Sequence, residues 1–218
     1  MPVTYIIALY ISIISGLFPV IAAWYNYRHL DKTLRIAAVF LCISAMVDCG
    51  SEVASHFDVP NNLPAFHLII FVSLIFFAVV YHDAFFNPVL KKVVIILSIL
   101  AGFALITNTI FNEGIWEYPT VSNTVVSILL IFFSLVYFFQ LLNRQEFIHI
   151  EKQGLFWINA GVLFYYSVNI FLFMLFRRIL STQQMDYYMI HNVSNIIANV
   201  LFTVGLLCKP QRMTLYRY

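Results

Sequence analysis

Three ionisable side chains inside one hydrophobic segment are the residues whose types and spacing could do chemistry. The segment 35–56 contains Asp48, Glu52 and His56 at intervals of four residues. In a helix, these intervals place the three side chains on one face. Ionisable groups inside a membrane are costly, so they mark a functional site. Two carboxylates one turn apart do not both stay ionised without a cation or donor between them, so the sequence leaves the charge states of Asp48 and Glu52 open.

Further polar residues are predicted at the same depth, near the outer ends of the other hydrophobic segments. His191 and Asn195 share one face of the last segment, and His67 begins the third. Because such groups need polar partners within lipid, their convergence predicts an outward-facing polar pocket. The predicted ligand-binding residues are Asp48, Glu52, His56, His67, Asn108, Asn123, Asn169, His191 and Asn195.

Two interpretations of this outer cluster are open at the level of sequence. In the first, His56, His67 and His191 bind Zn²⁺, which needs three protein ligands and an open water position for catalysis. Glu52 or Asp48 would then act as the general base or hold a ligand in place by a hydrogen bond. In the second, the same residues form a hydrogen-bond network that holds the helices together, recognises a ligand or relays protons.

The composition identifies the elements that must position these residues. The chain has 218 residues, of which 62% are apolar and only 10% charged, whereas soluble domains are about one quarter charged. A segment of about 20 apolar residues crosses a bilayer as a helix. An all-α bundle of seven transmembrane helices in a single domain, 1–218, is predicted. The predicted helices are 4–25, 35–56, 65–87, 91–112, 119–143, 154–179 and 187–208.

The distribution of basic residues predicts the orientation of this bundle. Ten of the twelve Lys and Arg residues lie after the first, third and fifth helices or in the tail, and only Arg177 and Arg178 lie on the other side. The positive-inside rule therefore places the N-terminus outside and the C-terminus in the cytoplasm. The net charge of +2 carries no signal for nucleic acid as a partner.

Part of the polar pattern resembles a known family. Glu52-Val-Ala-Ser-His56 is followed eleven residues later by His67, and the last segment contains His191-Asn-Val-Ser-Asn195. This arrangement resembles the alkaline ceramidases and adiponectin receptors, seven-helix zinc hydrolases with Ser-xxx-His on helix two and His-xxx-His on helix seven. Glu52 stands where that family has serine, and Asn195 where it has the second histidine. The resemblance implies an intramembrane zinc-dependent hydrolase of lipid amides or esters.

A second resemblance rests on the residue pattern of the last two helices. Its segments are Phe156-Trp157, Leu163-Phe-Tyr-Tyr-Ser167, Phe171-Leu-Phe173 and Val204-Gly-Leu-Leu-Cys-Lys-Pro210. They resemble bacterial multi-helix membrane modules that form the input portion of sensor histidine kinases or stand beside them. This resemblance implies signal input at a bacterial inner (cytoplasmic) membrane, with the kinase supplied by another chain.

The leading prediction is a ligand-sensing or interaction module that signals to a cytoplasmic partner through the Arg28–Arg35 loop or the tail. The alternative is the zinc-dependent hydrolase, with zinc as its cofactor. Covalently bound retinal is excluded, because the segment between Tyr187 and Cys208 lacks the lysine that a Schiff base requires.

Overall fold

The computed structural model describes residues 3–57, 62–143, 150–182 and 186–208. Within these ranges, the side chains of residues 55–56, 176–182 and 186–187 lie outside the description. All secondary structure in the described ranges is helical. The elements are α1 (Val3–Ser15), α2 (Leu17–Asn26), η1 (Tyr27–His29), α3 (Lys32–His56), α4 (Leu63–Ala84), α5 (Pro88–Asn108), η2 (Thr109–Glu113), α6 (Thr120–Leu142), η3 (Ile150–Lys152), α7 (Gly154–Thr182) and α8 (Asp186–Leu207).

Seven helical stretches in the described ranges are long and apolar enough to cross a membrane. The first span, Val3–His29, combines α1, α2 and η1, and each later span lies within one of α3 to α8 or, for the fourth, continues from α5 into η2. The prediction of an all-helical chain with seven spans is therefore confirmed. By helix length and hydropathy, the chain is a multi-pass membrane protein. Its orientation in the membrane stays a prediction.

Local sequence explains where α4 and α5 meet. Asn87 accepts a hydrogen bond from the backbone N–H of Val89 at 2.8 Å and so caps the start of α5. Pro88 occupies the first helical position, where no N–H partner is needed. α4 consequently ends at Ala84, earlier than the expected residue 87, and α5 begins at Pro88, before the expected residue 91.

The first span is divided into α1 and α2 at Gly16. Its backbone N–H is shared between the carbonyl oxygens of Ser12 and Ile13, at 3.3 and 3.1 Å. Three residues later, Pro19 has no N–H to donate to the carbonyl of Ser15. The buried Ser15 hydroxyl donates to the Ser12 carbonyl at 2.6 Å. Polar groups are thereby presented to the bundle interior.

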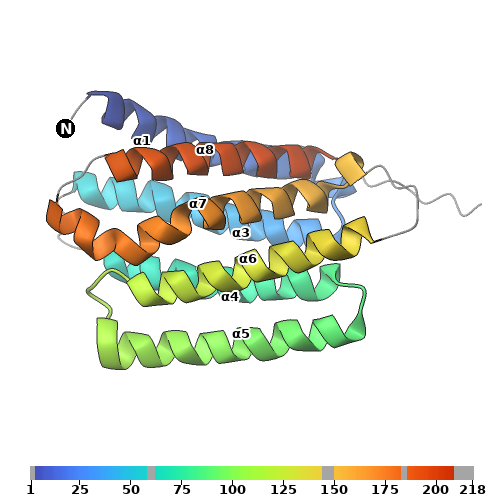
Figure 1. Ribbon diagram of the computed structural model, residues 1–218. Helices are drawn as coiled ribbons and strands as arrows, with labels where there is room; N and C mark the ends of the chain where they lie inside the picture. The colour runs from blue at the N-terminus through green and yellow to red at the C-terminus, as the bar shows by residue number, and fades with distance from the viewer. Residues whose placement is uncertain (1–2, 58–61, 144–149, 183–185, 209–218) are drawn as a thin grey trace, which may run out of the picture.

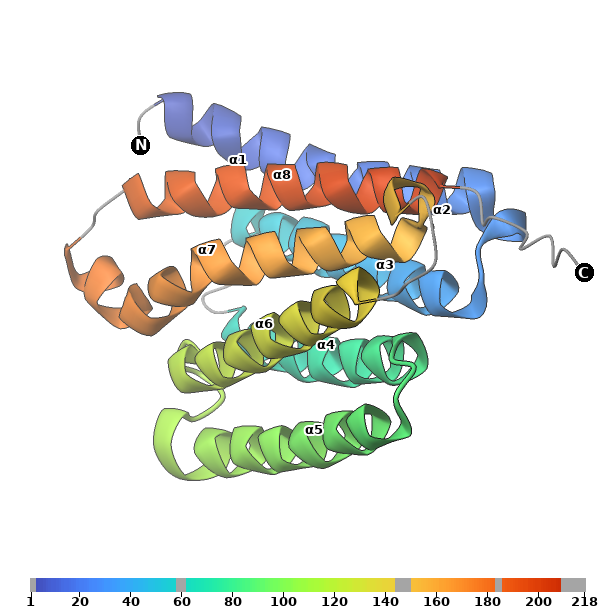
Figure 2. The same ribbon diagram turned by 45° about the vertical axis from the view of Figure 1, so that its right-hand side comes forward.

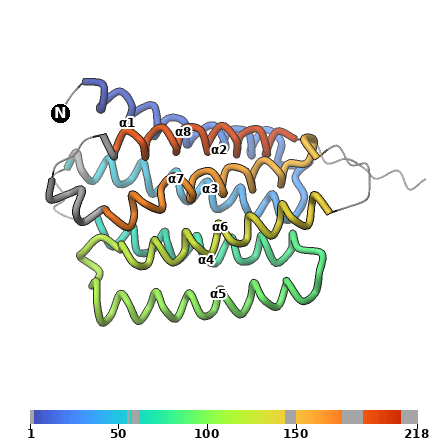
Figure 3. Tube along the Cα trace, in the orientation of Figure 1, coloured from blue at the N-terminus to red at the C-terminus, as the bar shows by residue number. Residues whose placement is uncertain are grey.

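Successive spans run antiparallel, as the tube in Figure 3 shows. Helix α8 lies between the first span and α7, α6 packs against α7 and α4, and α5 occupies the edge of the bundle beside α4 and α6 (Figures 1 and 2). The end of the bundle at which α1 begins is called the Val3 end, and the opposite end is the Leu207 end. The core contains fully buried side chains from α5, α6 and α8: Val94, Leu130, Phe133, Ala198 and Leu206.

Candidate ligand site and the polar networks around it

The predicted polar residues lie toward the Val3 end of the bundle, where α3, α5 and α7 end and α4, α6 and α8 begin (Figure 1). Among the described side chains, these residues do not form one cluster. Three separate hydrogen-bonded networks contain most of them, and the two carboxylates of α3 stand apart. This division separates the residues that hold helices together from those that remain open to a ligand.

The first network closes the turn between α5 and α6. Glu113 is buried, with 4% of its surface exposed, and its Oε1 accepts from the backbone N–H of Val121 at 2.7 Å. Asn108 donates from Nδ2 to Glu113 Oε2 and, at 3.0 Å, to the hydroxyl of Ser122. Gly114, with φ of 66°, provides the left-handed turn that lets the chain reverse after Glu113. Asn108 therefore holds Glu113 in place, and the Glu113 carboxylate caps the start of α6.

His67 and Asn123 attach the same turn to its neighbours. The Nε2 of His67 lies 3.0 Å from the carbonyl oxygen of Glu117, which can only accept, so Nε2 carries a proton. Its Nδ1 then accepts from the Thr109 hydroxyl at 3.4 Å. Asn123 donates from Nδ2 to the Tyr118 hydroxyl at 3.2 Å. Burial raises the pKa of Tyr118 to about 12, opposed by this hydrogen bond.

The second network joins α7 to α8. Asn169, which is fully buried, donates from Nδ2 to the Ser194 hydroxyl at 2.7 Å and to the Tyr165 carbonyl at 2.8 Å. Its Oδ1 lies 2.8 Å from Nδ1 of His191, so that nitrogen is the donor and Nε2 is left as the acceptor. Next along α8, Asn192 is buried, and its Nδ2 has no hydrogen-bond partner within the described residues.

The third network joins α8 to α1. Asn195 donates to the hydroxyl of Ser12, and one turn further on Asn199 donates to the hydroxyl of Ser15, both at 2.9 Å. Asn195 and His191 share a face of α8 in sequence, but their hydrogen bonds reach different neighbouring helices. In lipid, such interhelical bonds satisfy polar groups that have no water available.

The two carboxylates of α3 are arranged differently. Asp48 is exposed and Glu52 is half-buried, and within the described part of the chain neither has a hydrogen-bond or ion-pair partner. In residues 46–54 no side chain is buried, whereas Leu34, Ala37, Ala38, Phe40, Leu41 and Ala45 of the preceding turns belong to the core. This half of α3 is therefore packed only loosely against the bundle.

Tyrosine hydroxyls from two other helices lie within electrostatic range of these carboxylates. Glu52 lies within electrostatic range of the Tyr5 hydroxyl on α1, and Asp48 lies within range of the Tyr165 hydroxyl on α7. The Tyr5 ring meets the ring of Tyr188 on α8 edge-on, at 6.0 Å between centroids. These five residues are called the carboxylate–tyrosine cluster. The rings of Tyr165 and His191 also pack together, with their centroids 6.0 Å apart, and this contact connects the cluster to the second network.

The predicted zinc ligands are only partly covered by the structure. Among the residues that it describes, no group of three or more His, Cys, Asp or Glu side chains could hold a metal ion. The side chain of His56, the first predicted ligand, lies outside the described ones. Both ring nitrogens of His67 and the Nδ1 of His191 have hydrogen-bond partners. The metal site therefore stays a prediction from the sequence.

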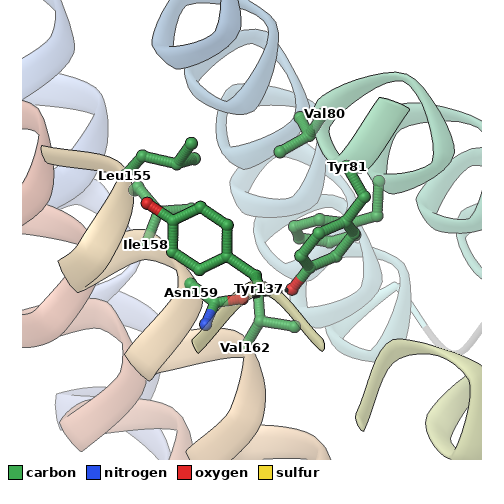
Figure 4. A pocket seen from close by; sticks show the side chains of 8 residues that line it. Val80, Tyr81, Tyr137, Leu155, Ile158, Asn159 and Val162 are labelled. Atoms are coloured by element: carbon green, nitrogen blue, oxygen red, sulfur yellow. Dashed lines mark hydrogen bonds between the residues drawn. The ribbon is translucent and has the colours of Figure 1, made fainter. Parts of the chain in front are cut away.

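Two polar features were missed by sequence reasoning. Glu113 lies between the predicted helices 91–112 and 119–143 and is not among the predicted ligand-binding residues, although an acidic side chain shortly before a predicted helix is a signal for a cap. The other is a buried hydrogen-bonded group of Tyr81, Ser134 and Asn159, called the dry knot. The Tyr81 hydroxyl contacts the Ser134 hydroxyl at 2.6 Å and donates to Asn159 Oδ1 at 2.7 Å. Tyr81 and Asn159 approach from α4 and α7 in Figure 4, and the space beside them has no room for a water molecule.

This dry knot is a structural contact between helices rather than a ligand pocket, since all of its polar groups are buried and paired. The carboxylate–tyrosine cluster is thus the part of the polar region whose two carboxyl groups have no hydrogen-bond or ion-pair partner among the described residues. No protein-family model matches the chain, and neither a curated protein nor a solved structure matches it significantly.

Proposed function

We propose that the chain is a membrane-embedded ligand-sensing module, whose ligand carries an organic cation and whose signal passes to a partner at the Leu207 end. The observation that carries the proposal is the pair Asp48 and Glu52, which has no partner among the described residues on a loosely packed half of α3. Two carboxyl groups about 6 Å apart along one helix face do not both stay ionised unless a cation or a donor lies between them.

The surrounding side chains favour the same class of ligand. The hydroxyls of Tyr5 and Tyr165 lie within electrostatic range of Glu52 and Asp48, and the Tyr188 ring packs against that of Tyr5. Aromatic faces attract cations, by about 0.5–2 kcal/mol for each well-placed ring. Because the tyrosines belong to α1, α7 and α8, a cation held between them and the carboxylates would connect α3 to three other helices.

That connection provides a mechanism for signalling. A ligand shifts an equilibrium only by its difference in affinity for the two states. A cation in the cluster favours an arrangement in which the loose half of α3 approaches α7 and α8. Because α3 is one continuous helix from Lys32 to His56, this movement alters its packing at the Leu207 end. There Arg28 and His29 are exposed before α3 begins and offer a contact for a partner.

The test is thermal stabilisation of the purified protein by choline, putrescine and spermidine. A ligand at 100 times its Kd raises the free energy of unfolding by about 2.7 kcal/mol, and we expect at least one probe to do so. The double variant Asp48→Asn/Glu52→Gln should lose this effect. Its matched control, Asp31→Asn/Glu151→Gln, makes the same charge change at the Leu207 end and should keep it.

The proposal fails if the probes stabilise the Asp48→Asn/Glu52→Gln variant as much as the unaltered protein. Signalling is tested separately, by reconstituting the chain and following its co-purifying partner with and without the active probe. Arg28→Glu should weaken that association while leaving stabilisation by the probe unchanged. Association that is indifferent to both the probe and Arg28→Glu would contradict the signalling part of the proposal.

A further inference from the structure

A second candidate site, independent of the carboxylate–tyrosine cluster, lies at the Leu207 end of α3. A groove of about 480 Å³ runs along the first turns of α3 toward α4. Its walls carry apolar and basic side chains from the start of α3 and one aromatic ring from α4. The residues that line it are Leu30, Asp31, Lys32, Arg35, Ile36, Val39 and Phe76.

The two kinds of side chain are separated along the groove. Lys32 and Arg35 lie in the first turn of α3, whereas Ile36, Val39 and Phe76 continue the groove deeper into the span. From Lys32 to Val39, a helix rises about 10 Å. The groove therefore has a basic mouth where the span begins and an apolar continuation within the hydrocarbon. An occupant that matches both parts is anionic at one end and apolar beyond it.

The mouth holds two cations, Lys32 and Arg35, and two carboxylates, Asp31 and Asp83, and of the two cations only Arg35 has no ion-pair partner among the described residues. Lys32 pairs with Asp83 at 3.0 Å, and its side chain is 79% exposed. Asp31 also lines the groove, and its Oδ1 accepts from the backbone N–H of Leu34 at 2.8 Å. Arg35 has no carboxylate partner in the described ranges, and its guanidinium lies 5.1 Å from the ring centre of Tyr27. This stacking orients a group that binds phosphate oxygens in pairs.

We propose that this groove binds an anionic phospholipid. The headgroup phosphate lies against Arg35 and Lys32, and one acyl chain lies over Ile36, Val39 and Phe76. A basic pocket between helices where a span begins suits a lipid headgroup of this charge. A free phosphate ion would make no use of the apolar continuation.

Native mass spectrometry of the detergent-purified protein tests the proposal. The probes are phosphatidylglycerol and phosphatidylcholine with identical acyl chains, and inorganic phosphate as competitor. We expect phosphatidylglycerol to be retained preferentially, and Arg35→Gln to weaken its retention about five-fold. Lys92→Gln, which removes an exposed charge on α5 outside the groove, is the matched control and should leave retention unchanged.

Asp83→Asn tests the same site from the opposite direction. It releases Lys32 from its ion pair, so retention of phosphatidylglycerol should increase, and this result does not depend on Arg35→Gln folding. Equal retention of the two lipids, or an equal loss in Arg35→Gln and Lys92→Gln, would show only non-specific contact and overturn the proposal. Displacement of the lipid by equimolar inorganic phosphate would reassign the groove to free phosphate.

Discussion

Gly154 of α7 and Gly205 of α8 face each other so closely that neither position has room for a side chain. A Cβ added to Gly154 would lie 2.4 Å from the Gly205 carbonyl oxygen, and one added to Gly205 would lie 2.7 Å from that of Gly154. Both obstacles are backbone atoms, which cannot rotate away. In a membrane, where helices gain little from hydrophobic burial, such close approach supplies the packing energy.

Gly154→Ala is therefore expected to force α7 and α8 apart and to lower the free energy of unfolding by about 1–3 kcal/mol. Reversible unfolding in mixed micelles measures the change. Gly50→Ala is the matched control, because an added Cβ there meets nothing within 4 Å. It should be neutral or stabilising by up to about 1 kcal/mol. Equal effects at the two positions would contradict the close contact.

Tyr81→Phe should destabilise the protein by about 1 kcal/mol, the scale of buried hydrogen bonds between membrane helices. The hydroxyl joins α4 to Ser134 and Asn159, and no water can replace it in this dry space. Tyr25→Phe removes a hydroxyl from a side chain that is 85% exposed and serves as the control. If the two variants unfold alike, the knot contributes nothing to stability.

Glu113→Ala should lower the free energy of unfolding by about 1–3 kcal/mol, because the variant leaves the Val121 N–H and the Asn108 amide without their buried acceptor. Glu113→Gln keeps one acceptor oxygen and should cost less. Hydrogen exchange of the first turn of α6 provides a local measure, and faster exchange is expected in Glu113→Ala. Unaltered exchange there would show that Glu113 does not cap α6.

Stability should fall as the pH rises through the range above 10 because of Tyr118. Its pKa is raised to about 12 in the folded state by burial, so below pH 10 the hydroxyl is neutral in both states and its contribution is complete. Between pH 10 and 12 the unfolded state loses the proton first, which favours unfolding. The partly exposed ring is screened by solvent, which limits the effect to about 1 kcal/mol. Tyr118→Phe should show a shallower decline; an identical pH profile would contradict this prediction.

Purified protein is expected to lack stoichiometric zinc at His67, since both of its ring nitrogens already bond to Glu117 and Thr109. Elemental mass spectrometry of the protein and of His191→Ala measures this directly. Near-stoichiometric zinc that disappears in His191→Ala would instead support the predicted site with His56, His67 and His191, and with it the hydrolase. Zinc that persists in His191→Ala would remove His191 from any such site.

The sequence by itself determined the number and approximate limits of the spans, because the length of an apolar run is a property of the chain alone. It also determined which polar residues share a depth, since depth follows from position along a helix. It placed Asp48 and Glu52 on one face, because their spacing matches the helical period.

Only the tertiary structure decided which polar groups meet. The rotation of each helix and its choice of neighbour are set by packing against other helices, which the order of residues does not reveal. His191 turns to Asn169 on α7, while Asn195, one turn later, turns to Ser12 on α1. Likewise, the loose packing of residues 46–54 of α3 leaves Asp48 and Glu52 without partners among the described side chains. The carboxylate–tyrosine cluster is a candidate site because no described side chain of another helix packs against Asp48 and Glu52 closely enough to bond to them.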